Sequence, residues 1–379
     1  MARVVVIVDA VRTAIARAGV DRSPLRNVRA DDLGVQCVTA IRDRNPALDP
    51  AEIEDVVFGC ANQSGEQSLN LARMIGLLAG LPVDVAGTTV DRQCGSGLQA
   101  INTATHAILA GAGDVAIAGG VESMTRVPMG TGMDPNQRLF TMYPPELAVM
   151  GLTAERLADM HGVTRIEADR FALRSNQRAI AARELFREEI IPITLEDGVF
   201  DTDQGPRADT SIEKLASLRP VFKPDGQVTA GNSSQVSDGA AAVLLMSAER
   251  ALSLGVKPLA RIVATAVAGV PPEIMGWGPV PATGKALKRA NLKIGDLDLV
   301  EINEAFAAQV IACNKSLGID EERLNVNGGA IALGHPLGCS GARLMVTLLH
   351  EMRRRGARLG LASLCIGIGQ GIATIIEAI

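Results

Sequence analysis

Apolar runs of strand length alternate with stretches of helical periodicity over most of the chain. Apolar runs at residues 4–9, 53–59 and 114–120 predict buried strands. Helical patterns lie between these runs, one at 30–42 that starts beside two aspartates and one at 70–79. This alternation predicts an α/β fold with a largely parallel sheet.

One predicted strand-to-helix turn carries a cysteine, Cys94. A strand-compatible run at 86–90 leads into it, and a helical face follows, formed by Leu98, Ile101, Thr105, Ile108 and Leu109. Gly95 and Gly97 permit a tight turn and the close approach of another backbone or a ligand. The partial positive charge at a helix N-terminus lowers the pKa of a thiol there below its usual value of about 8.5. Cys94 is therefore a candidate nucleophile, although a free cysteine can equally be a small buried apolar residue.

The second half of the chain repeats the order of elements in the first half. A predicted strand at 241–246 and a connector at 251–258 separate the two halves. Three pairs of apolar runs match: 259–264 corresponds to 4–9, 297–303 to 53–59, and 359–367 to 115–120. Residues 325–329 and the helix at 342–355 correspond to the Cys94 turn and the helix that follows it. The identities are weak but the order is the same, so we predict two similar α/β halves that arose by duplication.

The segment 121–236 differs in character from its surroundings. It is rich in methionine and contains several prolines. Thr164 with Glu167 three residues later is a capping-box pattern, and a charged amphipathic helix is predicted to follow it through residue 190. We interpret the segment as an insertion or subdomain. Its methionines form either irregular core or the lining of a pocket for a flexible ligand.

Composition and charge narrow the classes of function. The 379 residues are 47% hydrophobic and 21% charged, which is enough for a large core and two or three domains. The net charge is −5 and the chain has no basic patch, which argues against binding of nucleic acid. No apolar run reaches the length of about eighteen residues that a membrane span needs.

Six cysteines are spread along the chain without a CxxC pair or a nearby cluster of histidines. The first residues of this long chain read as a strand rather than a secretion signal, so the pattern predicts neither a disulfide framework nor a zinc site. The last residues, 377–379, carry no peroxisomal address. We therefore expect reduced thiols, no metal and a cytoplasmic protein.

Three turns that each follow a predicted strand carry residues capable of catalysis. The first holds Cys94, the second holds His335 in a glycine-dense loop, and the third begins at Cys365 and continues with Gly367. A nucleophilic cysteine needs a base, and a second cysteine beside it can move a second proton. Each residue also has an ordinary interpretation, because the histidine can cap a turn and the cysteines can be core.

Four sequence blocks resemble the signature blocks of the thiolase family, in the same order and over nearly the whole chain. They are VDRQCGSG around Cys94, NEAFA from Asn303, GGAIALGHPLGCSGAR around His335 and CIGIGQG from Cys365. The LGCS form of the histidine block and the large residue Ile368 resemble the degradative 3-ketoacyl-CoA thiolases, of the acetyl-CoA acyltransferase type, more than the biosynthetic acetoacetyl-CoA thiolases.

The resemblance implies a thiolase-like fold in which the two duplicated halves are layered α-β-α-β-α. It implies an N-terminal domain at 1–253, which includes a CoA-covering loop subdomain at about 121–236, and a C-terminal domain at 259–379. Two departures concern only local turn geometry. Ala14 and Ala16 stand where the family often has proline and glycine, and the segment after them, 18–25, is short.

The resemblance also implies thiolytic cleavage of a 3-oxoacyl-CoA by CoA, which yields acetyl-CoA and a shortened acyl-CoA. Cys94 would form the acyl-enzyme, His335 would take its proton, and Cys365 would protonate the released enolate and deprotonate the incoming CoA. One oxyanion hole would use His335 with a water held by Asn303, and the other would use the N–H groups of Cys94 and Gly367.

Further residues are assigned to CoA by the same resemblance, which makes CoA a substrate and implies no cofactor. Arg207 aligns with an arginine near the adenine, and Ser234 aligns with a serine on the pantetheine. The apolar residues around the pantetheine and thioester would be Met150, Met275 and Phe306. Family members are dimers or tetramers, so we expect a homo-oligomer, and association with other β-oxidation enzymes stays open.

Several alternatives stand beside this interpretation. A ketoacyl synthase would pair its cysteine with two histidines, and Asn303 and Cys365 stand in this sequence instead. The others are an acetoacetyl-CoA thiolase working in the biosynthetic direction and a non-catalytic CoA- or acyl-binding homologue, which should lack a reactive residue. Fatty, branched, aromatic-catabolic and steroid side-chain groups are all open as the acyl group.

Overall fold

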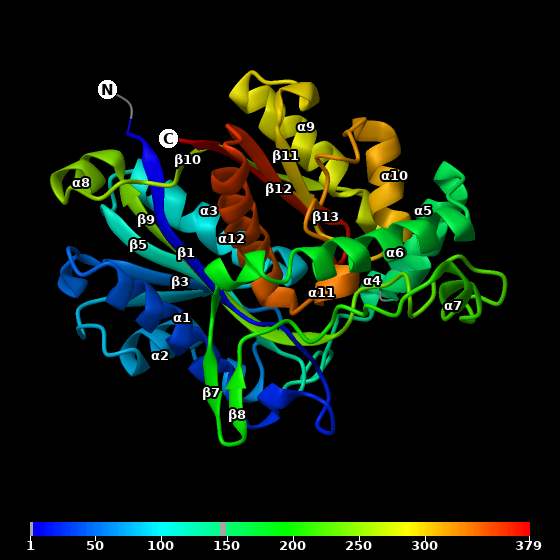
Figure 1. The fold of residues 1–379 in the computed structure, drawn as a ribbon, viewed down its shortest axis with the longest axis horizontal. Coiled ribbons are helices and arrows are strands. Elements are labelled where there is room, and N and C mark those ends of the chain that lie inside the picture. Colours follow the sequence, from blue (N-terminus) through cyan, green and yellow to red (C-terminus); the bar gives the residue numbers. More distant parts are fainter. Residues whose placement is uncertain (1–2, 145–148) are drawn as a thin grey trace.

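The computed structural model describes residues 3–144 and 149–379 and contains one continuous mixed sheet (Figure 1). The strands of its N-terminal half are β1 (Val5–Thr13), β3 (Asp55–Gly59), β4 (Ala86–Val90), β5 (Val115–Ser123) and β9 (Ser237–Ser247). The strands of its C-terminal half are β10 (Ala260–Gly269), β11 (Leu299–Ile302), β12 (Leu359–Ile366) and β13 (Gln370–Ala378). Two short strands, β2 (Ala16–Arg17) and β6 (Ile190–Ile191), pair with β9 and β1, and a separate hairpin is formed by β7 (Ile193–Leu195) and β8 (Gly198–Phe200).

The order of the strands confirms the predicted duplication. The N-terminal half has the order β1-β9-β5-β3-β4, and the C-terminal half has the order β10-β13-β12-β11. A single parallel bridge between Val300 and Leu324 stands where β4 stands in the first half. The first strands of the two halves, β1 and β10, pair antiparallel at Val6 and Arg261 and thereby join the half-sheets.

The prediction of a largely parallel sheet is wrong. β3 is parallel to β4 and β5, and β11 is parallel to β12, but β9 and β13 run antiparallel to both of their neighbours. Each of these two strands is the last of its half and returns along the sheet. The apolar pattern did not predict β13 as a separate strand, because only residues 367–369 divide it from β12.

Helices cover both outer faces of the half-sheets and fill the space between them, which confirms the layered α-β-α-β-α arrangement (Figure 1). The central layer consists of α3 (Ser96–Leu109) and α12 (Leu337–Arg355). Leu98 and Leu348 of these helices share one apolar cluster with Val243 of β9 and Ile372 of β13. The outer helices are α1 (Ala30–Arg44) and α2 (Leu71–Leu78) on the N-terminal half, and α9 (Pro279–Ala290) and α10 (Ala307–Leu317) on the C-terminal half.

The side chains of β9 show how one strand contacts two helical layers. Val243 and Leu245 belong to the central cluster, whereas Leu244 and Met246 belong to the cluster beneath α1. Successive side chains of a strand point to opposite faces of the sheet. Each such apolar side chain stabilises the fold by roughly 1.5–3 kcal/mol when it is fully buried. An unbroken apolar run is therefore what a strand between two helical layers requires.

The segment 121–236 connects β5 to β9, as predicted for an insertion, and pairs with the sheet between them at β6. Residues 145–148 of it lie outside the described residues. The capping box is confirmed, because the Thr164 N–H donates to Glu167 Oε2 (2.7 Å) and the Glu167 N–H donates to Thr164 Oγ1 (3.4 Å). The helices of the segment are α4 (Arg138–Met142), α5 (Met150–His161), α6 (Arg165–Ala181) and α7 (Ile212–Ala216).

The helix predicted through residue 190 ends earlier, at Ala181. Buried Glu189 is held by Arg12 of β1 instead, because the Arg12 N–H donates to the Glu189 carbonyl oxygen (2.9 Å) and Arg12 Nε donates to Glu189 Oε1 (2.6 Å). This long-range ion pair draws the chain back to the sheet, where Ile190 pairs with β1.

Two further predictions in the second half are wrong. Residues 325–329 form no strand, and the helix predicted from residue 342 begins at Leu337, so that Ser340 lies in α12 rather than in a glycine-rich loop. The remaining short helices are α8 (Ala248–Ser253), at the start of the predicted connector, and α11 (Ala330–Leu333). Among the helices of residues 3–144 and 149–379, none combines the length and the apolar composition needed to cross a membrane.

Candidate active site

Cys94 lies at the predicted strand-to-helix turn. β4 ends at Val90, a 3-10 turn spans Gln93–Gly95, and α3 begins at Ser96. Gln93 has a φ of +45°, and its N–H donates to Asp91 Oδ1 (2.7 Å), which fixes the turn. The Cys94 side chain is 5% exposed and packs against four apolar residues, Ala18, Ala61, Met124 and Leu337.

Burial raises the pKa of the Cys94 thiol to about 11, so the expected lowering at a helix start is wrong for the resting protein. Removal from water disfavours the thiolate. This effect outweighs the hydrogen bonds that the N–H groups of Gly367 and of Cys94 itself offer to the sulfur. Cys94 therefore rests as a thiol and needs a base before it can act as a nucleophile.

Packing, rather than turn conformation, requires glycine at positions 95 and 97. A Cβ on Gly97 would lie 2.7 Å from the carbonyl oxygen of Gly338, and one on Gly95 would lie 2.6 Å from Cδ1 of Ile366. Neither glycine has a positive φ. The predicted close approach of another backbone is thus confirmed, and it brings the Cys94 turn against α12 and β12 of the second half.

His335 lies between α11 and α12, with its side chain 5% exposed. Its backbone N–H donates to the Gln235 carbonyl oxygen (2.9 Å). Ring Nδ1 lies 2.6 Å from Ser340 Oγ, and the Ser340 hydroxyl lies 2.8 Å from the Pro336 carbonyl oxygen. That carbonyl can only accept, so we assign the hydroxyl proton to it and the ring proton to Nδ1, which donates to Ser340 Oγ.

This tautomer leaves Nε2 of His335 without a proton. Asn303 Nδ2, which can only donate, lies 3.3 Å from Nε2. Burial and then the positive charge of Arg343 lower the pKa of His335 to about 3, so the ring is neutral at physiological pH. The buried ring therefore presents an unprotonated nitrogen, which is what a general base needs. Leu337, two residues after His335, packs against Cys94.

Asn303 directly follows β11, and its N–H donates to the Ser363 carbonyl oxygen of β12 (2.9 Å). Its Oδ1 is buried and accepts no hydrogen bond from the described residues. Buried polar atoms are nearly always hydrogen-bonded in folded proteins. Asn303 thus donates to His335 and keeps an acceptor free for a small polar group in the site.

A carboxylate that the sequence patterns did not single out, Glu304, holds this segment. It accepts hydrogen bonds from Ser175 Oγ (2.6 Å), Asn325 Nδ2 (2.9 Å) and the Ile331 N–H (3.2 Å). Burial raises the pKa of Glu304, and these donors oppose the rise. The feature of the sequence that could have identified Glu304 is an acidic residue next to Asn303 inside an apolar block. Its carboxylate ties the segment that follows β11 to α6, to Asn325 and to α11.

Cys365 completes the site from the second half of the chain. It lies at the end of β12, is 1% exposed, and packs with Met275 and Phe306. Burial raises the pKa of Cys365, and a negative charge on Cys94 raises it further, because the two sulfur atoms are close. All six cysteines are buried free thiols.

Gly367 follows Cys365 closely, and the protein's own packing does not require glycine there. A Cβ at this position would lie 3.8 Å from the nearest atom, Cγ of Gln93, and φ is not positive. The Gly367 N–H lies near enough to the sulfur of Cys94 to oppose the rise in its pKa. The missing side chain therefore leaves room beside Cys94 rather than inside the packed core.

The residues predicted to contact CoA form two groups. Met150 and Ala154 pack in the cluster of Met275, Phe306 and Cys365, so these apolar residues lie together beside the second cysteine. Phe306 also contacts the ring of Phe222 edge-on, at a centroid distance of 6.2 Å. The structure thus brings Met150, Met275 and Phe306 together, and it adds Phe222, which sequence reasoning missed.

Ser234 and Arg207 are not members of that apolar cluster. The Ser234 N–H donates to the Ala305 carbonyl oxygen (2.9 Å), which places Ser234 next to the apolar cluster. Arg207 is exposed and lines a separate cavity of about 130 Å³ with Lys214 and Gln235. Since Gln235 also accepts from the His335 N–H, this cavity adjoins the histidine loop.

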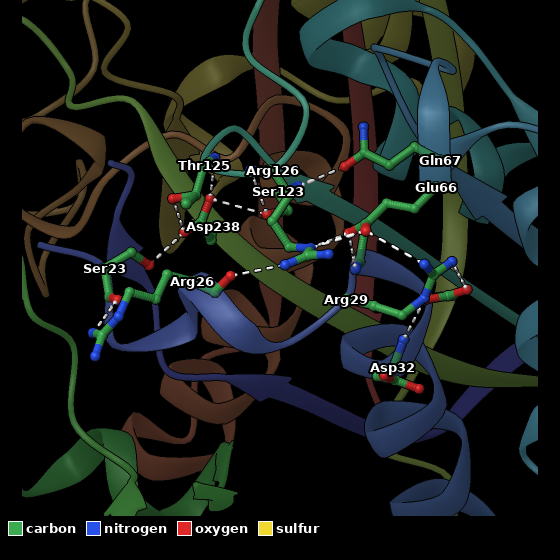
Figure 2. A network of polar contacts seen from close by, with 12 residues as sticks. Ser23, Arg26, Arg29, Asp32, Glu66, Gln67, Ser123, Thr125, Arg126 and Asp238 are labelled. Carbon is green, nitrogen blue, oxygen red and sulfur yellow. Dashed lines mark hydrogen bonds and ion pairs between the residues drawn. The ribbon is translucent and has the colours of Figure 1, made fainter. Parts of the chain in front are cut away.

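A polar network that the sequence patterns did not single out joins segments of the first half to β9 (Figure 2). The buried carboxylate of Asp238 accepts hydrogen bonds from Ser23 Oγ (2.6 Å) and from the N–H (2.8 Å) and Oγ1 (2.6 Å) of Thr125. Arg126 donates to Glu66 (2.8 Å). Thr125 directly follows Met124, which packs in the cluster of Cys94.

Glu122 links the two halves of the chain. Its carboxylate accepts from the N–H groups of Gly338 (2.8 Å) and Ala61 (2.9 Å) and from Gln67 Nε2 (2.7 Å). Gly338 lies in the first turn of α12, where N–H groups have no partner within the helix. Glu122 therefore holds the N-terminus of α12, just after His335, against the first half.

Comparisons with known proteins match this arrangement. The family model "Thiolase, N-terminal domain" matches residues 5–249, and "Thiolase, C-terminal domain" matches residues 256–378. The 3-ketoacyl-CoA thiolase of Marinobacter nauticus is 52% identical, covering 100% of this chain and 99% of its own length. Among solved structures, the Bacillus anthracis acetyl-CoA acetyltransferase superposes with a TM-score of 0.91 at 43% identity, over 100% of this chain and 99% of that one. Human mitochondrial 3-ketoacyl-CoA thiolase in complex with CoA also superposes with a TM-score of 0.91 at 41% identity, covering 100% of this chain and 98% of that one.

Proposed function

The chain belongs to the thiolase family, and we propose that it is a 3-ketoacyl-CoA thiolase that cleaves 3-oxoacyl-CoA with CoA, yielding acetyl-CoA and a shortened acyl-CoA. One observation carries the proposal. Cys94, His335 and Cys365 come from three turns in two halves of the chain and are all buried; a charge on Cys94 raises the pKa of Cys365, and Leu337, two residues after His335, packs in the cluster of Cys94. The relative with 52% identity bears the name of this activity.

In the first half-reaction, Cys94 attacks the 3-keto carbon of the substrate while His335 Nε2 takes the thiol proton. The carbon–sulfur bond forms and the bond between C2 and C3 breaks, which leaves an acyl group on Cys94 and releases the enolate of acetyl-CoA. Cys365 donates its proton to the enolate carbon and becomes a thiolate. A base is needed because the Cys94 thiol has a pKa of about 11 at rest.

In the second half-reaction, the Cys365 thiolate takes the proton of an incoming CoA thiol. The CoA sulfur attacks the thioester carbonyl on Cys94, the shortened acyl-CoA leaves, and His335 returns its proton to Cys94. The raised pKa of Cys365 suits this role, because a weakly acidic thiol is a strong base once it has lost its proton.

Two oxyanions develop along this path, and two sets of donors are available for them. The free acceptor of Asn303 and the ring of His335 are suited to hold a water that faces the enolate oxygen. The N–H groups of Cys94 and Gly367 converge on the sulfur that carries the acyl group. Preorganised donors of this kind typically contribute on the order of 3 kcal/mol each to transition-state stabilisation.

CoA acts as a substrate in this proposal, and no cofactor takes part. The pantetheine and thioester would lie along Met150, Met275 and Phe306, which pack beside Cys365. Ser234 is next to this cluster, and Arg207 would meet the adenine end from its own cavity. The human relative of similar fold was solved in complex with CoA.

The proposal is tested first with Cys94→Ala. This variant should lose both the CoA-dependent cleavage of acetoacetyl-CoA and the covalent acyl label on the protein, while its melting temperature stays near that of the parent. Normal cleavage by Cys94→Ala would refute the assignment.

Cys365→Ala distinguishes the roles of the two cysteines. It should still accept an acyl group on Cys94 in a single turnover, and it should lose most of its steady-state rate. Equal loss of acylation and turnover would argue against Cys365 as the second acid and base.

Arg207→Ala probes the predicted nucleotide end of CoA. The Michaelis constant for CoA should rise and kcat should change little, because the guanidinium is remote from the reacting atoms. An unchanged Michaelis constant would remove Arg207 from the site.

A second candidate is an acetoacetyl-CoA thiolase that works in the biosynthetic direction, since the Bacillus anthracis acetyl-CoA acetyltransferase is 43% identical. Turnover of a panel of 3-oxoacyl-CoAs of varied length and branching separates the two, because the second would accept only the four-carbon substrate. A non-catalytic homologue is disfavoured, because every candidate reactive residue is present.

We propose that the chain forms a homo-oligomer through the edge of its sheet at β4. This strand ends the sheet and is only partly buried, and Leu69, Leu78 and Val83 near it are 85%, 54% and 74% exposed. A partly apolar sheet edge favours pairing with another chain. Light scattering should give the mass of a dimer or tetramer, and a monomer at micromolar concentration would contradict this proposal.

We also propose a cytoplasmic location and a division into domains at 1–253 and 259–379.

A further inference from the structure

Arg343 of α12 is a buried cation without a close partner. Its side chain is 1% exposed, and none of its three guanidinium nitrogens has a hydrogen-bond partner within the described residues. The nearest carboxylate is Glu301 of β11, whose Oε2 lies 3.8 Å from Arg343 Nη1 and also has no partner. Glu301 is 3% exposed. Burying two charges costs several kcal/mol unless the charges are well paired, so this loose pair calls for a reason other than stability.

A second buried arginine in the same protein shows what a structural ion pair looks like here. Arg12 donates to Glu189 (2.6 Å) and donates with two nitrogens to Asp203 (2.8 and 2.9 Å). Its hydrogen-bonding capacity is largely satisfied, as buried ion pairs require. The contrast indicates that Arg343 and Glu301 are held near each other by the packing of α12 on β11 and are not locked together.

The positions of both residues connect them to the catalytic histidine. Glu301 precedes Asn303 by two residues, and the sheet hydrogen bonding continues through the Asn303 N–H, so both side chains face α12. Arg343 follows Ser340 by three residues on α12, which places them on one face of the helix. Among the described residues, Asn303 and Ser340 hydrogen-bond the His335 ring.

From this geometry we infer that Glu301 and Arg343 form a positioning pair behind His335, which aligns Asn303 with the ring and sets how readily the ring accepts the Cys94 proton. The inference rests on the proposed function. A net positive charge on the pair opposes formation of the imidazolium, and an ionised Glu301 cancels that charge.

The protonation state of Glu301 controls the net charge. Burial raises the pKa of Glu301 to about 8, and Arg343 opposes the rise. The other charged groups that face Glu301 are Glu304 beside β11, Glu189 before β6 and Glu351 of α12, and all of these raise its pKa. Glu301 is therefore protonated below about pH 8 and ionised above it, so transfer of the Cys94 proton to His335 becomes easier as the pH rises through this value.

The test is the single-turnover rate of acylation, measured as acetyl-CoA released from a 3-oxoacyl-CoA by excess enzyme without added CoA. In the parent, ionisation of Glu301 should increase this rate near pH 8. This increase adds to the one that ionisation of other groups causes. Glu301→Gln keeps the side-chain volume and leaves Arg343 uncompensated at every pH. It should lose that rise and be about tenfold slower at pH 9, which corresponds to a change of about one pKa unit at the ring.

Further variants keep the test independent of folding defects. Arg343→Lys retains the charge and should retain the rise. Glu301→Gln combined with Arg343→Met removes the pair as a unit, which buried ion pairs often tolerate, and should lack the rise. Thr105→Val is the matched control, because Thr105 is a buried hydroxyl of the other central helix, α3, and bonds the Ile101 carbonyl oxygen (2.8 Å), so its profile should equal that of the parent.

If Glu301→Gln and the double variant keep the parental pH profile, the inference is wrong. A parent that releases no acetyl-CoA from any 3-oxoacyl-CoA contradicts the proposed function itself, so the two failures are distinguishable.

Discussion

Ser340 Oγ lies 2.6 Å from Nδ1 of His335, five residues earlier in the chain. The contact fixes both the orientation of the ring and its tautomer, because the Ser340 hydroxyl is occupied with the Pro336 carbonyl oxygen (2.8 Å) and can only accept from Nδ1. Nε2 is thereby left as the nitrogen that accepts a proton. Ser340 sits in the first turn of α12, so the start of that helix and the base are one structural unit.

Ser340→Ala should lower kcat/KM for thiolysis about tenfold. The variant loses one hydrogen bond worth about 1 kcal/mol and allows the other tautomer, in which Nε2 carries the proton. Steady-state assays with a 3-oxoacyl-CoA measure the effect. Thr105→Val is the control, because Thr105 is also buried and bonds the carbonyl oxygen of Ile101 (2.8 Å) in the other central helix. Equal activity of Ser340→Ala and the control would exclude this role for Ser340.

Gly367→Ala should reduce kcat by at least about tenfold without a loss of stability. The added Cβ meets no protein atom closer than 3.8 Å, so its cost falls on a substrate oxygen that approaches the Gly367 N–H. Gly371→Ala gives the opposite result, because its Cβ would lie 2.0 Å from the Gly278 carbonyl oxygen. That variant should be destabilised by about 1–3 kcal/mol. Urea unfolding and kcat, measured on both variants, distinguish the two effects.

Local patterns predicted the parts of this structure that local forces determine. The turn at Cys94, the capping box at Thr164 and the buried strands of both halves follow from periodicity, glycine and short-range hydrogen bonds. The site residues were identified from motif blocks, and the structure buries Cys94, His335 and Cys365 and packs Leu337, two residues after His335, in the cluster of Cys94.

The predictions from the sequence are wrong where contacts between residues distant in the chain determine the structure. The direction of β13 depends on its pairing with β10 and β12, and the end of α6 depends on the pull of Arg12 on Glu189. The pKa of Cys94 depends on how completely the folded protein excludes water, which outweighs the effect of the helix start. Arg343 ends the histidine block and Glu301 precedes the block at Asn303, but neither was assigned a role, because a charged residue in a sequence does not show whether it is buried.

Alkylation of Cys94 by iodoacetamide should accelerate about tenfold per pH unit from pH 7 to pH 10. The thiol has a pKa of about 11, raised by burial, so the reactive thiolate is a small fraction that grows with pH throughout this range. His335, with a pKa lowered to about 3, adds no inflection near pH 6.5. Mass spectrometry of the labelled protein measures the rate, and Cys94→Ala defines the background. A plateau at pH 6 to 7 would instead indicate a preformed thiolate–imidazolium pair.

The residue after Gly367 has a strained backbone. Ile368 has a φ of +61° and is 49% exposed. A β-branched residue rarely adopts this left-handed conformation, which costs about 1–2 kcal/mol. The strain lies one residue from the N–H that is directed at Cys94, and strained residues persist where the surrounding structure holds them, often at functional sites.

Ile368→Gly should therefore raise the free energy of unfolding by up to about 1 kcal/mol and lower kcat. Glycine relieves the left-handed strain, although part of the gain is offset by its greater freedom in the unfolded chain. The same freedom lets the turn move, so the Gly367 N–H is less well oriented. Urea midpoints and kcat, measured together, check both effects. Asn291→Gly is the control, because Asn291 has a φ of +54° but asparagine tolerates this conformation, so its gain should be smaller. A less stable Ile368→Gly would show that its side chain, rather than its backbone, is what the turn needs.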